Sequence, residues 1–299
     1  MGRVTLLNNA QLMKRISREY TFGDACDSYL DHRRVLGETD VANIRRLNVV
    51  LQEIKLDEIS RRFIHNQIAE PMYAKGLTDS TIRRFLTTCQ TVLNHAHHME
   101  LTDNQVKVDK PSEGAPRDVW ITLEEVDQFI GHCHPKFKAF ATFLFFTGCR
   151  LGDALKCNWT HLHDGCVLFK TRKGKRSIVR KRYVPLHEKI VAAVGEPDVS
   201  GYILKLNGRG WNKSEVYPYW KHAVEMCLAD TTKGSASYER FYGITPHGAR
   251  HTFASLLIMN EVSERDVAEL LGHSSMDMMK RYTHLSTSHL KKAILKLGV

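Results

Sequence analysis

One segment rich in proline, glycine and charge, Lys107–Arg117 (KVDKPSEGAPR), limits what this 299-residue chain can fold into. Such a composition is typical of a linker between folded parts. A chain of this length can also hold two substantial cores. We therefore predict a linker at 107–117 between domains at 21–106 and 118–285, with an N-terminal extension at 1–20 and a C-terminal tail at 286–299.

The first predicted domain has the apolar spacing of amphipathic helices. Ile82, Leu86, Cys89, Leu93 and Ala96 lie on one face of a helix of about twenty residues. Pro71 is expected to kink or end one of the other helices. Four helices predict a small helical module; the other three stretches are Phe22–Leu36, Thr39–Ile54 and Ser60–Lys75.

The second predicted domain has clear helix start and stop signals. Thr122 and Glu125 form a T-x-x-E capping box. The apolar run Phe137–Thr147 predicts a buried helix, and Gly148 is suited to end it. Thr245 is a good N-cap, and the proline that follows it suits the first helical position.

Strand signals in this domain are few. Cys166–Lys170 and Tyr183–Leu186 are typical of two strands of a small antiparallel sheet. Ser263 and Asp266 begin a further helix that Gly272 would end. The predicted fold class is mainly α (α+β), with a helical N-terminal domain and a mostly helical second domain that contains a small antiparallel β-sheet.

Charge and composition narrow the function. A net charge of +10 and a pI near 9.2 indicate a polyanionic partner. The most apolar run, Ala139–Phe146, is far shorter than the roughly 20 residues of a membrane span, and residues 1–10 lack a signal peptide's apolar segment. The seven cysteines are scattered without a C-x-x-C pair, as expected of reduced cytosolic thiols.

Three segments contain side chains suited to phosphate chemistry. TGCRLGDAL supplies Arg150, TPHGARHTFAS supplies His247 and Arg250, and LGHSSMDMMKRYTHL places His273 nine residues before Tyr282. A phenol, imidazoles and guanidiniums provide an oxygen nucleophile, proton donors and fixed positive charge for a phosphorus transition state. His247 and Arg250 share one face in the first turn of a predicted helix, whose N-terminus itself favours phosphate.

In order and spacing, these segments closely resemble the tyrosine recombinases, the phage-integrase family. The resemblance covers the C-terminal 180 or so residues. It implies that the active site consists of Arg150, His247, Arg250, His273 and Tyr282. Asp153 stands where glutamate is commoner in the first box, and we expect it to orient Arg150 or to cap a hydrogen-bond network. The resemblance also makes 21–106 a core-binding domain and 118–285 a catalytic domain.

The resemblance implies a mechanism without a metal, ATP or another cofactor. Tyr282 attacks a DNA phosphate and displaces the 5′ hydroxyl, leaving a 3′-phosphotyrosine, while Arg150 and Arg250 clamp the non-bridging oxygens. His247 positions or deprotonates the tyrosine, and His273 donates to the phosphate. Because the covalent bond conserves the phosphodiester energy, a 5′ hydroxyl from a partner duplex can reverse the step.

The departing 5′ oxygen needs a proton, and the predicted hairpin is rich in cations. A lysine among cations can have a lowered pKa and act as the general acid. In the family this lysine lies on the hairpin, and the Lys-Gly pair at 173–174 resembles its setting, so we assign Lys173, with Lys175 as the alternative. The remaining cations are expected to contact the DNA backbone; the candidates there and in the first domain are Arg172, Lys175, Arg176, Arg45, Arg46, Arg83 and Arg84, the last four being equally compatible with ordinary solvated faces.

Other functions fit the sequence less well. The group Cys157, His161, His163 and Cys166 matches no zinc spacing, and the boxes supply no acidic pair for two metals. A glycine-rich nucleotide loop is also missing from the sequence. A type IB topoisomerase would share the cleavage chemistry but religate the same strand. A binding-only descendant would lack catalytic groups, and a metal-dependent nuclease would need clustered carboxylates.

The resemblance further implies that the partner is double-stranded DNA with two recombination sites, bound by a homotetramer, and that the DNA passes through a Holliday-junction intermediate. Whether accessory DNA-bending proteins take part stays open, as does the role in a phage, transposon, integron or chromosome. Leu290, Ile294 and Leu297 in the tail could form a helix face that docks on a neighbouring subunit. No membrane association is expected, and a phage or prokaryotic protein of this kind would be cytoplasmic and nucleoid-associated.

Overall fold

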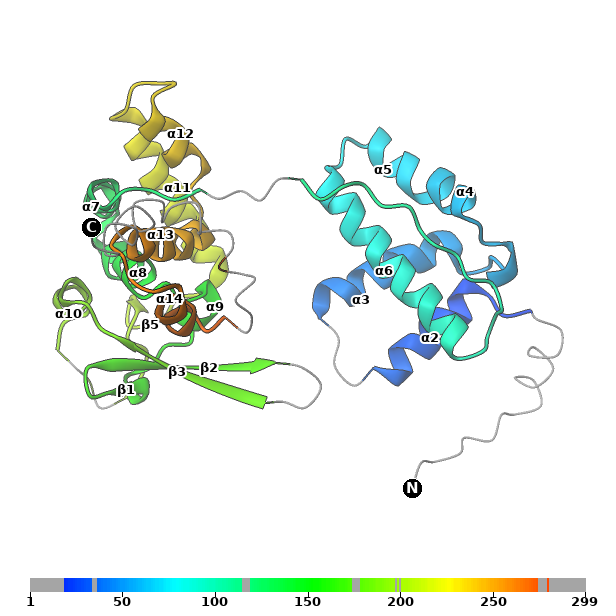
Figure 1. Ribbon diagram of the computed structural model, residues 1–299, viewed down its shortest axis with the longest axis horizontal. Helices are drawn as coiled ribbons and strands as arrows, with labels where there is room; N and C mark the ends of the chain where they lie inside the picture. Colours follow the sequence, from blue (N-terminus) through cyan, green and yellow to red (C-terminus); the bar gives the residue numbers. More distant parts are fainter. Residues whose placement is uncertain are drawn as a thin grey trace, which may run out of the picture. The chain divides into compact units, whose positions relative to one another are not determined.

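The chain divides into two compact units, residues 1–116 and 117–299. Figure 1 shows the computed structural model, in which both units are mainly helical. The predicted fold class is confirmed, because strands occur only in small antiparallel sheets of the second unit within the described chain. The structure describes residues 19–33, 37–114, 119–173, 178–196, 198, 200–273 and 279, with only the backbone at 171–173 and 178.

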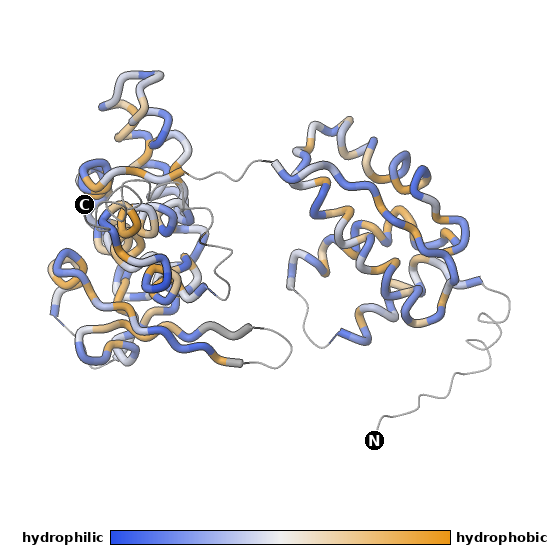
Figure 2. The backbone as a smooth tube through the Cα atoms, viewed as in Figure 1, coloured by the Kyte–Doolittle hydropathy of each residue, from blue (hydrophilic) through white to orange (hydrophobic). Residues whose placement is uncertain are grey.

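The first unit is built from the amphipathic helices that the sequence predicts. Its longest helix, α6, packs against α2 and α3, and apolar residues recur along it with polar ones between them (Figure 2). Thr21 caps α2 through a complete capping box with Asp24. The elements are α2 (Phe22–His32), α3 (Glu38–Leu51), the 3₁₀ turn η1 (Leu56–Glu58), α4 (Arg61–Ile64), the π segment η2 (His65–Ala69), α5 (Glu70–Ala74) and α6 (Asp79–His98).

Pro71 does not end the third predicted helix. The helical segment runs on to Ala74, and the π segment His65–Ala69 directly precedes the proline's turn. Proline lacks an N–H and crowds the carbonyl four residues before it. A wider π turn is one way to relieve that crowding within a helix.

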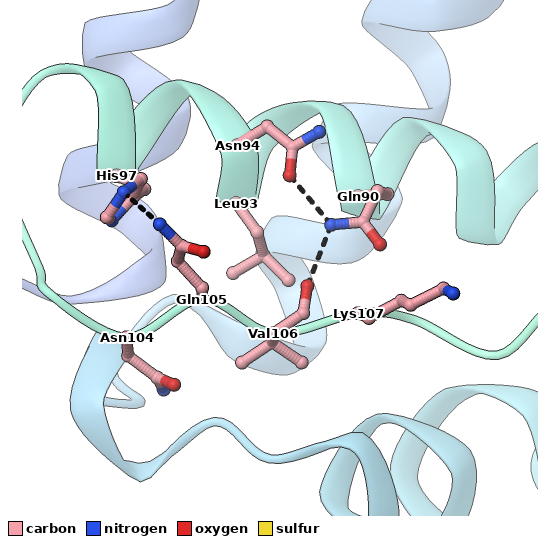
Figure 3. Close-up of a pocket in the computed structure, with 8 residues that line it drawn as sticks. All are labelled: Gln90, Leu93, Asn94, His97, Asn104, Gln105, Val106 and Lys107. Carbon is pink, nitrogen blue, oxygen red and sulfur yellow. Dashed lines mark hydrogen bonds between the residues drawn. The ribbon is translucent and has the colours of Figure 1, made fainter.

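The predicted linker is partly bound to the first unit. Residues 101–113, here called the strap, run along α6, and Val108 is buried in the first core. Figure 3 shows how Gln90 holds the strap: its side-chain nitrogen donates to the carbonyl of Val106 at 2.8 Å. The Gln90 oxygen accepts from the amide of Val108 at 2.7 Å. Arg83 adds a bond to the Pro111 carbonyl at 2.6 Å.

The second unit is organised around α8, most of whose residues are buried. Helices α7, α9, α10 and α13 all pack on it. An aromatic cluster that includes Phe129, Phe137 and Trp220 forms the centre of this core. The helices are α7 (Leu123–His132), α8 (Pro135–Thr147), α9 (Leu151–Ala154), α10 (Glu188–Val194), α11 (Lys213–Ala229), α12 (Ala236–Gly243), α13 (Pro246–Met259) and α14 (Glu264–Leu271), with a 3₁₀ turn at Trp159–His161.

A three-stranded antiparallel sheet covers one side of this unit. Its order is β1 (Leu162–His163), β2 (Cys166–Lys173) and β3 (Ile178–Pro185), so both main strands extend beyond the predicted ranges. Helix α14 packs against β3. A separate two-residue pair, β4 (Lys205–Leu206) and β5 (Arg209–Gly210), was not predicted.

Buried polar contacts join helices that are distant in sequence. Glu125 of α7 is buried and accepts a bond of 2.8 Å from Arg240 and one of 2.5 Å from Ser237, both on α12. A buried carboxylate satisfied by a guanidinium and a hydroxyl fixes these two helices together. All seven cysteines are free thiols, and six of them are buried.

Candidate active site

Arg250 lies deep in the second unit, on the helix that Thr245 and Pro246 begin. The Thr245 hydroxyl accepts from the amide of Gly248 at 3.1 Å, as the predicted N-cap requires. Arg250 is 4% exposed, and its two terminal nitrogens donate to the carbonyls of Gly148 at 2.9 Å and Leu271 at 2.7 Å. These two bonds fix the plane of the guanidinium.

The two carbonyls that hold Arg250 come from helix ends with left-handed glycines. Gly148 ends α8 at φ 57° and Gly272 ends α14 at φ 67°. At Gly148 a Cβ would lie 2.4 Å from the ring of Phe253, so both the conformation and the space require glycine. The predicted stops at Gly148 and Gly272 are confirmed, and they present carbonyls at the negative ends of two helices.

Arg150 and Asp153 follow the first of these turns. Arg150 is the N-cap residue of the short helix α9, and Asp153 lies in that helix. The Nη1 of Arg150 is buried and has no hydrogen-bond partner among the described residues. Asp153 accepts instead from Nη2 of Arg182 at 3.2 Å. Of the two roles considered for Asp153, the structure therefore supports a place in a hydrogen-bond network.

His273 directly follows the glycine that ends α14. Its amide donates to the carbonyl of Ala268 at 2.9 Å, which closes the helix-ending turn. Burial and the positive charges of Arg250, Arg150 and Arg182 lower its pKa to about 4. The imidazole is therefore neutral near pH 7, and its buried Nδ1 has no partner within the described part of the chain.

His247 and Arg250 share the first part of α13 but differ in environment. His247 is exposed, whereas Arg250 is buried. The ring of His247 contacts that of His251, one turn further along, with centroids 4.8 Å apart. His251 is buried and contributes to the lowered pKa of His273. Sequence reasoning missed His251, although its i, i+4 spacing from His247 could have indicated the contact.

The hairpin also contributes Arg182, a cation that sequence reasoning did not single out. Arg182 is 7% exposed, and it lies over the ring of Phe169 with its guanidinium carbon 4.6 Å from the centroid. It also donates to the Leu271 carbonyl. Its head group is therefore enclosed by protein, unlike those of the exposed Arg180 and Lys181 on the same strand.

Several predicted site residues lie wholly or partly outside the described structure. The backbone of Arg172 and Lys173 ends β2, and their side chains are not described. The structure does not describe the predicted nucleophile Tyr282, the hairpin residues Lys175 and Arg176, or the tail 286–299. The structure thus brings together Arg150, Arg250 and His273, and it adds Arg182 and His251 to them.

The first-unit candidates for DNA contact differ among themselves. Arg45 and Arg46 are exposed on α3. Arg84 is exposed and lies 4.0 Å from the Asp40 carboxylate. Arg83 holds the strap through Pro111 and pairs with Glu113 at 2.9 Å, so its guanidinium has a structural use.

The described residues also show whether side chains are grouped to hold a metal ion and whether any helix could span a membrane. In the described ranges, no group of three or more histidine, cysteine or acidic side chains is placed to hold a metal ion. None of the described helices is long and apolar enough to cross a membrane.

Known proteins with similar sequences belong to a family of DNA integrases and recombinases. The profile of the phage integrase family matches residues 119–289, more than half of the chain. The chain belongs to the phage integrase family. It is 25% identical over 238 residues to the integrase of Escherichia phage 186, a match covering 77% of this chain and 64% of that protein. It is also 25% identical over 263 residues to tyrosine recombinase XerC of Rickettsia prowazekii, covering 81% and 80% of the two chains.

Solved integrases share the fold of this family member. The Tn1549 transposon integrase in complex with circular intermediate DNA matches with a TM-score of 0.68 at 16% identity, over 92% of this chain and 99% of that one. A lambda integrase dimer bound to a COC′ core site matches with a TM-score of 0.65 at 16% identity, over 91% and 80%. The comparisons support site-specific recombination and do not favour the topoisomerase alternative.

Proposed function

We propose that this phage integrase family member is a site-specific DNA recombinase that cleaves and rejoins strands through a 3′-phosphotyrosine at Tyr282. One observation carries the proposal. Arg150 and His273 each have a buried nitrogen without a partner among the described residues, beside an Arg250 that is fixed by two carbonyls. Buried donors without acceptors are costly, and a phosphate would supply acceptors for them.

The charges of the cluster match the needs of phosphoryl transfer. The guanidiniums of Arg150, Arg182 and Arg250 all act on His273, and Arg182 is paired with the carboxylate of Asp153, so positive charge is in excess among the described residues of the cluster. The attack on a phosphodiester builds negative charge on the non-bridging oxygens. Preorganised guanidiniums in an enclosed site stabilise that charge without further reorganisation. We assign the clamp to Arg150 and Arg250.

The remaining roles follow the chemistry of the step. The Tyr282 oxygen forms a bond to phosphorus as the bond to the 5′ oxygen breaks, and Lys173 gives that oxygen a proton. His247 positions or deprotonates the tyrosine. A neutral His273 can donate one N–H to the phosphate without adding a charge. The reaction conserves the phosphodiester energy, so we propose that it needs no metal ion and no ATP.

The partner in this proposal is double-stranded DNA at two sites. Support comes from solved structures of similar fold, which include a lambda integrase tetramer bound to a Holliday junction, with a TM-score of 0.64 at 16% identity. A net charge of +10 also suits a polyanion. We propose a tetramer on DNA, with the first unit as the core-binding domain and Arg45, Arg46 and Arg84 at phosphates.

Covalent trapping tests the function. A DNA substrate nicked near the cleavage site loses the 5′ hydroxyl needed for rejoining, so it should trap the wild-type protein on DNA in EDTA. Tyr282→Phe should abolish trapping and keep DNA binding, because only the nucleophilic oxygen is removed. Tyr217→Phe is the control, since Tyr217 is an exposed tyrosine of α11 and should trap normally. Trapping by Tyr282→Phe, or a strict need for magnesium in the wild type, would contradict the proposal.

A further inference from the structure

Arg182 is a buried cation for which the proposed chemistry has no role. It pairs across the hairpin with Phe169 in the β2–β3 register, and its neighbours Lys181 and Tyr183 are exposed. Strand alternation therefore points Arg182 into the unit together with Val184, on the face opposite Lys181.

The Arg182 side chain joins three segments of the site. It donates to the carbonyl of Leu271, which also accepts from Arg250, and to the carboxylate of Asp153. Leu271 lies two residues before His273, and Asp153 lies three residues after Arg150. One guanidinium thus bridges the strand, the turn that presents His273 and the helix that follows Arg150.

The fit between Arg182 and the turn is close. A Cβ on Gly272 would lie 3.1 Å from both Cδ and Nη1 of Arg182. The glycine therefore allows the turn to approach the arginine stem as well as to adopt its positive φ. The Nε of Arg182 is buried without an acceptor in the described part of the chain.

The buried guanidinium of Arg182 is not explained by stability of the fold alone. A buried ion pair often contributes less to stability than apolar side chains of similar volume, because both charges lose their hydration. The site around Arg182 is next to Phe169 and the buried strand residue Val184, where an apolar side chain would pack. The directional hydrogen bonds are what an apolar side chain could not supply.

We propose that Arg182 is a positioning residue that holds the turn at Leu271 and the Asp153 carboxylate so that His273 and Arg150 face the phosphate. The inference rests on the proposed recombinase function. Arg182 itself does not touch DNA in this account, and it acts through the residues that do. It differs in this from the exposed cations of the same strand, such as Arg180.

The test compares Arg182→Met and Arg182→Lys with Arg180→Met, a matched control at an exposed arginine of the same strand. Single-turnover cleavage of the nicked substrate should slow about 100-fold in both Arg182 variants, as expected when catalytic groups are misplaced. DNA affinity should stay within about threefold, since no phosphate contact is lost. Arg180→Met should show the opposite pattern, with weaker binding and nearly normal cleavage of bound DNA.

The pKa of His273 shows whether Arg182 acts by positioning its neighbours or only by its positive charge. It also reveals a variant in which the surroundings of His273 are generally damaged. In labelled-histidine NMR, with the signal assigned by His273→Asn, Arg182→Met should raise the pKa of His273 because one neighbouring positive charge is gone. Arg182→Lys keeps a charge, so the pKa should stay low while cleavage stays slow. Recovery of wild-type cleavage by Arg182→Lys would show that charge alone matters and would overturn the proposal.

Three further outcomes of these experiments would each decide whether Arg182 has the positioning role. If Arg182→Met does not fold, Arg182→Lys decides, and cleavage within about threefold of wild type overturns the inference. Equal losses of binding and cleavage would make Arg182 a DNA contact, which also overturns it. If the wild-type protein itself is not trapped on DNA, the proposed function fails, whereas normal trapping by folded Arg182 variants contradicts only the positioning role.

Discussion

The two units differ in what they bury. Within its described residues, the first unit buries only uncharged polar groups, namely Asn43, Thr88 and Thr102, around an apolar helical core. The second unit buries Arg182 and Arg250 close to one another. Burying charges costs free energy unless the partners are well placed. Among the described residues, the second unit thus accepts a costly arrangement that the first avoids, which agrees with our proposal that the second performs the chemistry and the first binds DNA.

Among the substitutions below, removal of the hairpin lysine in the second unit is expected to reduce the cleavage rate most. Lys173→Ala should slow cleavage by about 10²–10⁴, the usual contribution of a general acid. A substrate with a 5′-bridging phosphorothiolate should restore the rate, because a sulfur leaving group needs no proton.

Lys175→Ala is the control for the lysine assignment, and if impaired it should not be rescued. Rescue of Lys175→Ala in place of Lys173→Ala would transfer the role of general acid to Lys175. Lack of rescue in both variants would remove both lysines from that role.

An arginine from each unit provides a direct contrast. Arg150→Ala should reduce the cleavage rate about 10²–10³-fold, the usual loss for one transition-state donor, and should change affinity little. Its buried Nη1 has no hydrogen-bond partner among the described residues, so its removal breaks no described hydrogen bond of that nitrogen. Arg84→Ala in the first unit should weaken binding modestly and leave cleavage of bound DNA unchanged. Similar binding and cleavage losses in both variants would remove the distinction between the units.

The pH dependence of stability gives a smaller effect. The pKa of His273 falls from 6.5 to about 4 on folding, so below pH 6.5 the unfolded chain binds a proton that the folded protein does not. The stability that His273 contributes as a neutral imidazole is therefore fully present above pH 6.5, and it is lost as the pH falls from 6.5 towards 4. Because His273 is only partly buried, we expect a loss of about 1 kcal/mol, or roughly 2–4 °C in Tm.

Thermal melting of wild type and His273→Asn between pH 7 and 4 measures that loss. Asparagine does not titrate in this range, so the difference in Tm between the two proteins should shrink or reverse as the pH falls. An unchanged difference over the whole range would show that His273 is not held neutral.

Local signals in the sequence predicted much of the fold. Helix α13 begins at the predicted N-cap Thr245, and α14 ends at the predicted Gly272. Caps and left-handed glycines act within a few residues, so they can be recognised without tertiary information. The same holds for the stripe on α6, which packs in the first core as predicted.

The site was less predictable because burial of a cation depends on distant partners. Arg182 stands among similar cations, and its acceptors at Asp153 and Leu271 are far away in sequence. One available signal was its position two residues before Val184, which puts both on the inner face of the strand. The strap was missed for a similar reason, because the bonds of Gln90 and Arg83 to it are tertiary contacts that composition does not reveal.

Mapping the covalent bond tests the central claim most directly. Wild-type protein trapped on the nicked substrate can be digested with nuclease and trypsin and sequenced by mass spectrometry. Trypsin should release Tyr282–Lys291, whose only tyrosine is Tyr282. We predict a nucleotide attached through its 3′ phosphate to Tyr282 and to no residue of the first unit. A nucleotide on any other side chain, or cleaved DNA without covalent protein, would contradict the account.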